Sequence, residues 1–174
     1  AGSEYVRFYS ELLSSEKLLQ AARRLGYTLA FLPHPSVQAH LEHFTIAPEV
    51  EVLGAQTEYR DVFAQSDLLV TDYSSVVFDF AYLRKPVIYT HFDASSFFGG
   101  NHTYTKGYFD YERDGFGEVE TDLEGTVERI ISYMEEGCVL KEGYRQRIDA
   151  FFAFDDRENC RRVTQAILER TGKK

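Results

Sequence analysis

The stretch Leu68-Leu69-Val70-Thr71-Asp72-Tyr73-Ser74-Ser75-Val76-Val77-Phe78-Asp79-Phe80 decides how this chain folds. Leu68 to Val70 form a short apolar run, which is typical of a parallel strand that is covered on both faces. From Val76 to Leu83 nearly every residue is apolar, so we expect a deeply buried helix. The stretch therefore predicts a buried strand, then a tight polar turn, then a buried helix.

The polar turn is the strongest candidate for a ligand site. It consists of Thr71, Asp72, Tyr73, Ser74 and Ser75. We expect Ser74 or Ser75 to cap the following helix, which leaves unpaired backbone N–H groups facing the turn. In an open α/β sheet such a turn lies at the carboxyl edge, where phosphorylated ligands bind. An ordinary helix cap is the simpler explanation, but it does not account for so many consecutive hydrogen-bonding side chains, and we favour an anion site.

The strands and helices alternate along the first half of the chain. Strand-like runs recur at intervals of about 20 residues, and helical segments separate them. These runs are Tyr27 to Leu32, Glu49 to Leu53, Leu68 to Thr71 and Val87 to Thr90. The pattern predicts an α/β fold with a Rossmann-like, doubly wound parallel sheet. Right-handed crossovers would place all four carboxyl ends on one edge of the sheet.

Helix boundaries can be predicted from capping residues. Ser15 is expected to cap a helix that Gly26 ends. Thr121 and Glu124 have the spacing of a capping box, so we expect a helix to follow Thr121. The last helix is expected at residues 158–171.

The stretch 91–117 differs in composition from its flanks, because it is rich in glycine, aspartate and aromatic residues. We expect a long surface excursion there, and loops of this length inside a compact domain are commonly functional. Asp93 is a candidate for binding a ribose or substrate hydroxyl, although it could equally cap a turn. Lys106 is a candidate phosphate clamp, but a solvated lysine is the commoner explanation.

Two further residues outside the turn are singled out by their surroundings in the sequence. His34 lies between two prolines just after a predicted strand, so its backbone is held extended at the same sheet edge. Histidine suits acid–base chemistry or pairing with a phosphate, although a lone histidine in a loop is usually only solvated. Asp79 follows Ser75 by four residues in an apolar helix, where a buried carboxylate needs hydrogen-bond partners. We expect Asp79 to brace the turn structurally.

Composition excludes several classes of partner. The chain has 174 residues and 44% of them are hydrophobic, which is enough for a buried core. The net charge of −9 argues against nucleic acid, because phosphate backbones need a basic face. No apolar stretch approaches the about 20 residues of a membrane helix.

Neither the cysteines nor the histidines predict a metal or a cofactor. The two cysteines, Cys138 and Cys160, lack metal-ligand spacing and are expected to be reduced thiols in a cytoplasmic protein. The acidic residues do not cluster with histidine at ligand spacing, so we expect no metal site. His40 and His43 are expected on a helix surface.

The central stretch resembles the CDP-glycerol glycerophosphotransferase family, whose members build teichoic-acid-type polymers. The resemblance covers nearly the whole chain. The segments that carry it are Ser66-Asp67 to Asp79-Phe80, Lys85-Pro86-Val87-Ile88-Tyr89, Asp93, Phe31-Leu32-Pro33-His34-Pro35, Lys106-Gly107-Tyr108-Phe109-Asp110, and Phe151-Phe152-Ala153-Phe154 with Asp156, Asn159-Cys160 and Arg162-Val163. The central motif is long enough to be specific, whereas a His-Pro pair alone is not.

The resemblance implies one half of a glycosyltransferase-B-like (GT-B-type) fold, namely the carboxy-terminal half that binds a cytidine nucleotide donor. The implied reaction moves glycerol phosphate, or another alditol phosphate, from a CDP-alditol to a hydroxyl of a polymer or lipid-linked acceptor and releases CMP. It implies a role in catalysis or donor binding for His34, either as a base or as a cationic clamp. It implies that residues 71–75 hold the donor phosphate, with Asp93 and Lys106 as further donor-binding candidates. No cofactor is implied.

The chain departs from the family pattern in its extent and at one position. Residues 1–3 resemble a cloning remnant, and we expect residues 4–174 to form a single donor-binding domain without the amino-terminal half. The last helix, 158–171, is then expected to pack on that half, and its exposed face could make the fragment dimerise. Lys106 stands where the family pattern has arginine, which replaces a bidentate fork by a point charge. Membrane contact at the inner face of the cell membrane is expected to come from regions outside this chain.

Two other functions remain open at this stage. A nucleotide-sugar glycosyltransferase domain could use the same scaffold, and donor selectivity would separate it from a CDP-alditol enzyme. A non-catalytic binding module could also keep the fold. In that case, substitution of His34 or Ser74 would leave polymer synthesis intact.

Overall fold

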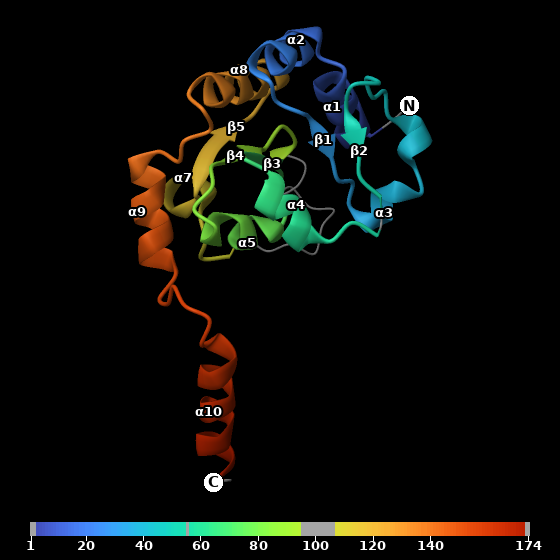
Figure 1. Ribbon diagram of the computed structural model, residues 1–174. Helices are drawn as coiled ribbons and strands as arrows, with labels where there is room; N and C mark the ends of the chain where they lie inside the picture. Colours follow the sequence, from blue (N-terminus) through green and yellow to red (C-terminus); the bar gives the residue numbers. More distant parts are fainter. Residues whose placement is uncertain (1–2, 55, 95–106, 173–174) are drawn as a thin grey trace.

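The computed structural model describes residues 3–54, 56–94 and 107–172 (Figure 1). Helices and strands alternate along most of this length. The elements are α1 (Glu4–Leu13), α2 (Glu16–Leu25), β1 (Ala30–Phe31), α3 (Pro35–Gln38), the 3-10 helix η1 (Leu41–His43), β2 (Glu51–Val52), α4 (Tyr59–Gln65), β3 (Leu69–Thr71), α5 (Val76–Tyr82), β4 (Val87–Thr90), α7 (Tyr111–Asp114), β5 (Gly117–Glu120), α8 (Leu123–Glu135), α9 (Glu142–Phe151) and α10 (Asn159–Thr171).

All strand pairs are parallel, as the sequence predicts. β1 pairs with β2 in one hydrogen-bonded sheet, and the second sheet has the order β3-β4-β5. The four predicted strands are confirmed, although each of the first two is only two residues long. β5 was not predicted, because it lies at the end of the stretch that we expected to be a surface excursion. It pairs with β4 from Val87↔Gly117 to Thr90↔Glu120.

Helices cover both faces of the strand layer, which is the doubly wound arrangement. One core lies between the strands and α1, α2 and α8, and a second lies against α4, α5 and α9 (Figure 1). Successive residues of β4 alternate between the two cores, with Ile88 in the first and Val87 and Tyr89 in the second. All four side chains of β4 are buried. The parallel α/β prediction is therefore confirmed.

Two of the predicted caps are confirmed and one is displaced. The Ser15 side chain accepts the Leu18 N–H, and Gly26 ends α2 with a φ of 77°. The capping box at Thr121 is wrong by one residue, because Asp122 begins α8 and its carboxylate accepts the Gly125 N–H at 2.8 Å. A carboxylate at this position also interacts favourably with the helix dipole.

Lys85 joins α4 to the turn before β4. Its ammonium group donates to the carbonyl oxygens of Phe63, Ala64 and Ser66 at 2.8, 2.9 and 2.6 Å. These carbonyls lie at the C-terminal end of α4, where no backbone N–H is available to them. The Lys-Pro pair of the sequence pattern thus has a structural role in holding α4 against the sheet.

Helix α10 extends away from the rest of the chain (Figure 1). None of its residues is buried, and Val163 and Ile167 are more than half exposed. No helix in the described ranges is long and apolar enough to cross a membrane.

The close approach of β5 to β4 gives a stability test at Gly117. A Cβ at this position would lie 1.7 Å from the Val87 carbonyl oxygen, so Gly117→Ala must push the two strands apart. We expect a loss of about 3 kcal/mol or more in the free energy of unfolding, measured by urea denaturation. Gly143→Ala is the control, because a Cβ there meets nothing within 4 Å and alanine favours the helix. Equal stability of the two variants would contradict this account of the sheet.

Candidate functional site

Polar side chains gather where three of the parallel strands end. His34 follows β1, the 71–75 turn follows β3, and His91 and Asp93 follow β4. His34 and Asp93 both act electrostatically on the Asp72 carboxylate. The predicted convergence of these segments is therefore confirmed, but the prediction of a single sheet is wrong, because β1 and β2 form one sheet and β3, β4 and β5 form another.

Asp72 organises the backbone of the turn. Its carboxylate accepts the Ser74 N–H at 3.1 Å, which closes a local side-chain-to-backbone turn. Ser75 occupies the N-cap position of α5, but neither serine forms the side-chain cap that the sequence predicts. Within the described ranges, no hydrogen bond engages the Ser74 or Ser75 hydroxyl. The Asp72 carboxylate, and not a serine hydroxyl, therefore shapes the turn.

Thr71 and Tyr73 point into the protein and not into solvent. Each side chain is only 8% exposed. The Tyr73 hydroxyl donates to Asp93 at 3.2 Å, and its ring stacks on His91 with centroids 4.3 Å apart. The Thr71 carbonyl accepts the Thr90 hydroxyl at 3.3 Å. Their clearest contribution is to fix the turn against β4.

His91 is a site residue that sequence analysis ranked low. Its imidazole stacks on the Tyr73 ring and meets the Tyr111 ring edge to face, and its Nε2 atom is buried without a hydrogen-bond partner among the described residues. Burial lowers the pKa of His91 from 6.5 to about 4, although Asp93 acts in the opposite direction. His91 is therefore neutral near pH 7. The signal in the sequence is its position directly after β4.

The site contains the carboxylates of Asp72 and Asp93, and Asp93 disfavours the charged form of Asp72. Burial raises the pKa of Asp72; the Ser74 N–H lowers it, Asp93 raises it further, and His34 lowers it. Burial, followed by Asp93, also raises the pKa of Tyr73. Asp72 thus lies close to a second carboxylate, to the Ser74 amide and to His34.

His34 is exposed and its orientation is fixed by Ser36. The ring Nδ1 accepts the Ser36 N–H at 3.3 Å and lies 2.7 Å from the Ser36 hydroxyl oxygen. Because Nδ1 is the acceptor for an amide, the neutral ring carries its proton on Nε2. The structure thus favours a ring that presents an Nε2–H donor.

Asp79 does not have the environment that we predicted. Its side chain is exposed, and no hydrogen bond joins it to Ser75 or to the turn among the described residues. The expected bracing role is wrong because α5 buries only one face, formed by Val77, Phe80 and Ala81. Lys106 lies outside the described residues.

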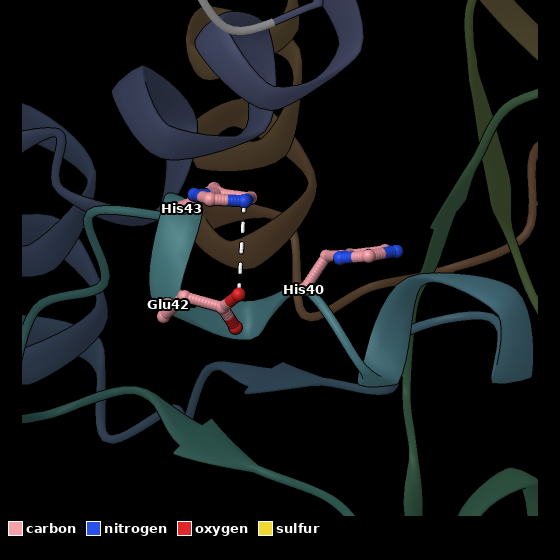
Figure 2. A group of neighbouring side chains, drawn as sticks. All are labelled: His40, Glu42 and His43. Atoms are coloured by element: carbon pink, nitrogen blue, oxygen red, sulfur yellow. Dashed lines mark ion pairs between the residues drawn. The ribbon is translucent and has the colours of Figure 1, made fainter.

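One group of potential metal ligands occurs in the described part of the chain, which the sequence analysis did not expect. His40, Glu42 and His43 offer ligand atoms that all lie within 4.8 Å of one another. The group projects from η1, on the segment that follows His34 and α3 (Figure 2).

Comparisons with known proteins agree on one family. A family profile described as "CDP-Glycerol:Poly(glycerophosphate) glycerophosphotransferase" matches residues 2–169. The minor teichoic acid biosynthesis protein GgaB of Bacillus subtilis is 37% identical over 96% of this chain, and the match covers 18% of GgaB. A teichoic acid poly(ribitol-phosphate) polymerase of Bacillus spizizenii is 32% identical over 89% of this chain, which is 23% of that polymerase.

Solved structures show the same fold. A variant of the wall teichoic acid polymerase TagF aligns with a TM-score of 0.62 and 20% identity, over 91% of this chain and 37% of TagF. A TagF variant soaked with CDPG aligns with a TM-score of 0.59, over 97% of this chain and 45% of that chain. The chain therefore spans less than half of the length of each of these relatives.

The buried neutral state of His91 predicts a specific pH dependence. The folded pKa lies below the unfolded one, so the stability due to neutral His91 is present above pH 6.5 and is lost as the pH falls toward 4. This loss is at most about 1.4 kcal/mol per pH unit for one proton. We expect His91→Phe to remove this share of the slope, measured by urea unfolding at pH 7, 5.5 and 4.5. Equal slopes for the variant and the parent chain would contradict the assignment, and His91→Asn repeats the test if phenylalanine does not fit.

Proposed function

Because the chain belongs to the CDP-glycerol:poly(glycerophosphate) glycerophosphotransferase family, we propose that it is the donor-binding half of such a transferase. In this reaction an acceptor hydroxyl attacks the alditol-bearing phosphate of a CDP-alditol, and CMP leaves. The observation that carries the proposal is the meeting of the Asp72 turn and Asp93 at the carboxyl edge of the β3-β4-β5 sheet, with His34 near enough to act on the Asp72 carboxylate. Nucleotides bind at such edges in open α/β sheets.

The donor phosphates are proposed to lie against the Ser74 and Ser75 hydroxyls. These hydroxyls have no protein partner among the described residues, whereas the Asp72 carboxylate is occupied by the Ser74 N–H. Asp72 thereby holds the turn, and Thr71 and Tyr73 support it from inside the fold. Asp93 is proposed to bind a donor hydroxyl. Lys106 stays a prediction for a phosphate clamp.

His34 is proposed to bind phosphate and not to act as the base. The contact of Nδ1 with Ser36 leaves the Nε2–H of the neutral ring as a donor toward a phosphate oxygen. A donor aimed at developing phosphate charge stabilises the transition state without taking a proton. The proton acceptor for the attacking hydroxyl would then come from outside this chain.

The names of the relatives differ in the alditol phosphate. One relative is named a poly(glycerol phosphate) polymerase and another a poly(ribitol-phosphate) polymerase. We propose a CDP-alditol donor because both of these polymerases are similar to this chain. We propose glycerol as the alditol because the family description names it. A polymer or lipid-linked acceptor completes the proposed reaction.

Helix α10 is proposed to pack on the other Rossmann-like half of the enzyme. Its apolar residues Val163, Ile167 and Leu168 are exposed, which leaves an apolar stripe without a partner among the described residues. Cross-linking between α10 and that half in the full-length protein tests this arrangement. Peripheral contact with the inner face of the membrane is proposed to involve regions beyond this chain.

Substitutions at His34 separate a phosphate-binding role from a basic one. We expect His34→Ala to lower the transfer of labelled glycerol phosphate from CDP-glycerol about 10²- to 10³-fold in the full-length protein. His34→Gln keeps an N–H donor near the position of Nε2 but removes the base, so we expect it to retain at least about tenfold more activity than His34→Ala.

Ser74→Ala is a second variant for the same assay and is expected to raise KM for the donor, whereas Ser66→Ala, outside the site, serves as the control. If His34→Gln were as inactive as His34→Ala, the phosphate-binding role would be wrong. If all of these variants retained full activity, a non-catalytic module would be the better explanation.

A further inference from the structure

The turn between α3 and β2 brings three metal-ligating side chains together. His40 immediately precedes η1, and Glu42 and His43 belong to it. In a 3-10 helix, residues i and i+3 lie on the same side, so the two histidines face the same direction. Their rings are nearly parallel, with an interplanar angle of 12° and centroids 6.0 Å apart. Figure 2 shows the Glu42 carboxylate projecting on the same side of the turn as the two rings.

The ligand types match those that a first-row transition ion prefers. Two imidazoles and one carboxylate form the ligand set of many zinc sites that keep a fourth position open. The ligand atoms lie within 4.8 Å of one another, against the about 3.4 Å between ligand atoms that tetrahedral zinc requires. All three side chains are exposed, so small rotations can close this difference without disturbing the core.

A cation could bind between His43 and Glu42 in place of their direct contact. His43 Nε2 lies 3.6 Å from Glu42 Oε1, which is beyond ordinary hydrogen-bond distance. An ion between these atoms would satisfy both lone pairs. It would also neutralise a carboxylate in a protein whose net charge is −9.

A pocket next to the group gives room for a fourth ligand. Its volume is about 460 Å³, and His40 and His43 line it together with Tyr5, Ser36 and Phe44. An ion held by the two imidazoles would therefore present its open position to this pocket. Ser36 also contacts His34, so the ion would lie on the segment that orients the proposed phosphate-binding residue.

We propose that His40, Glu42 and His43 form a binding site for a divalent first-row transition ion of the zinc type, with an open position toward the pocket. The site binds the ion through the two imidazole nitrogens and one carboxylate oxygen. None of its three ligands belongs to the 71–75 turn, and the proposal does not depend on the proposed donor chemistry.

Titration of the chelator-treated chain with Zn²⁺ and with Co²⁺ tests this site. We expect one ion per chain by calorimetry, and Co²⁺ is expected to give the absorption of a low-coordinate nitrogen and oxygen site. His40→Ala and His43→Ala should each weaken binding at least about tenfold, because each removes one of three ligands. Glu42→Gln should weaken it less, because the amide oxygen still offers a lone pair.

Matched controls distinguish this site from adventitious binding. Glu49→Gln removes a nearby exposed acid, and His34→Gln removes an exposed histidine on the preceding turn. Both should bind Zn²⁺ as the parent chain does. The ligand variants change only exposed side chains, so their folding can be checked by circular dichroism. Absence of saturable binding, or binding that survives both His40→Ala and His43→Ala, would overturn the proposal.

Discussion

The parallel pairing of β4 with a strand on each side is the constraint on which the rest of the structure depends. β4 is fully buried, and β3 and β5 run in the same direction beside it. Parallel pairing brings the carboxyl ends of these strands to one edge, so the residues that follow each strand must meet there. The Thr90 hydroxyl strengthens this edge by donating to the Thr71 carbonyl.

The polar residues that follow β1, β3 and β4 combine carboxylates with hydroxyl groups and an imidazole. The side of Asp72 and Asp93 disfavours additional negative charge, as the raised pKa of Asp72 indicates. Ser74, Ser75 and His34 add two hydroxyls and a ring donor, and none of these side chains hydrogen-bonds a carboxylate among the described residues. Buried His91 adds a nitrogen without a hydrogen-bond partner among the described residues, beside the rings of Tyr73 and Tyr111, at a cost in stability.

Much of the fold could be predicted because it depends on local patterns. The apolar runs before Pro33, Thr71 and His91 are strands, and Ser15 and Gly26 bound α2 as expected. β5 could not be predicted, because Glu118 and Glu120 make its sequence polar. Residues distant in the sequence stabilise these acids. Tyr133 and Lys141 each donate to Glu118 at 2.6 Å, and Arg129 donates to Glu120 at 2.7 Å.

The candidate site was predictable in position but not in detail. The turn after β3 and the histidine after β1 were identified from their places in the pattern. The burial of His91 could not be predicted, because it requires the rings of residues 73 and 111 to converge on it. The Ser36 contact that fixes the His34 ring and the exposure of Asp79 could not be predicted either, because each depends on side-chain placement that periodicity does not determine.

Amide NMR titration of the isotope-labelled chain with CDP-glycerol, CMP and a UDP-sugar tests the central claim most directly, because it detects even millimolar binding. The account predicts that the shifts concentrate on residues 72–77 and on the His34 segment, and that the cytidine ligands cause larger shifts than the UDP-sugar. Shifts confined to other parts of the chain, or no preference for cytidine, would contradict the assignment of this sheet edge as the donor site.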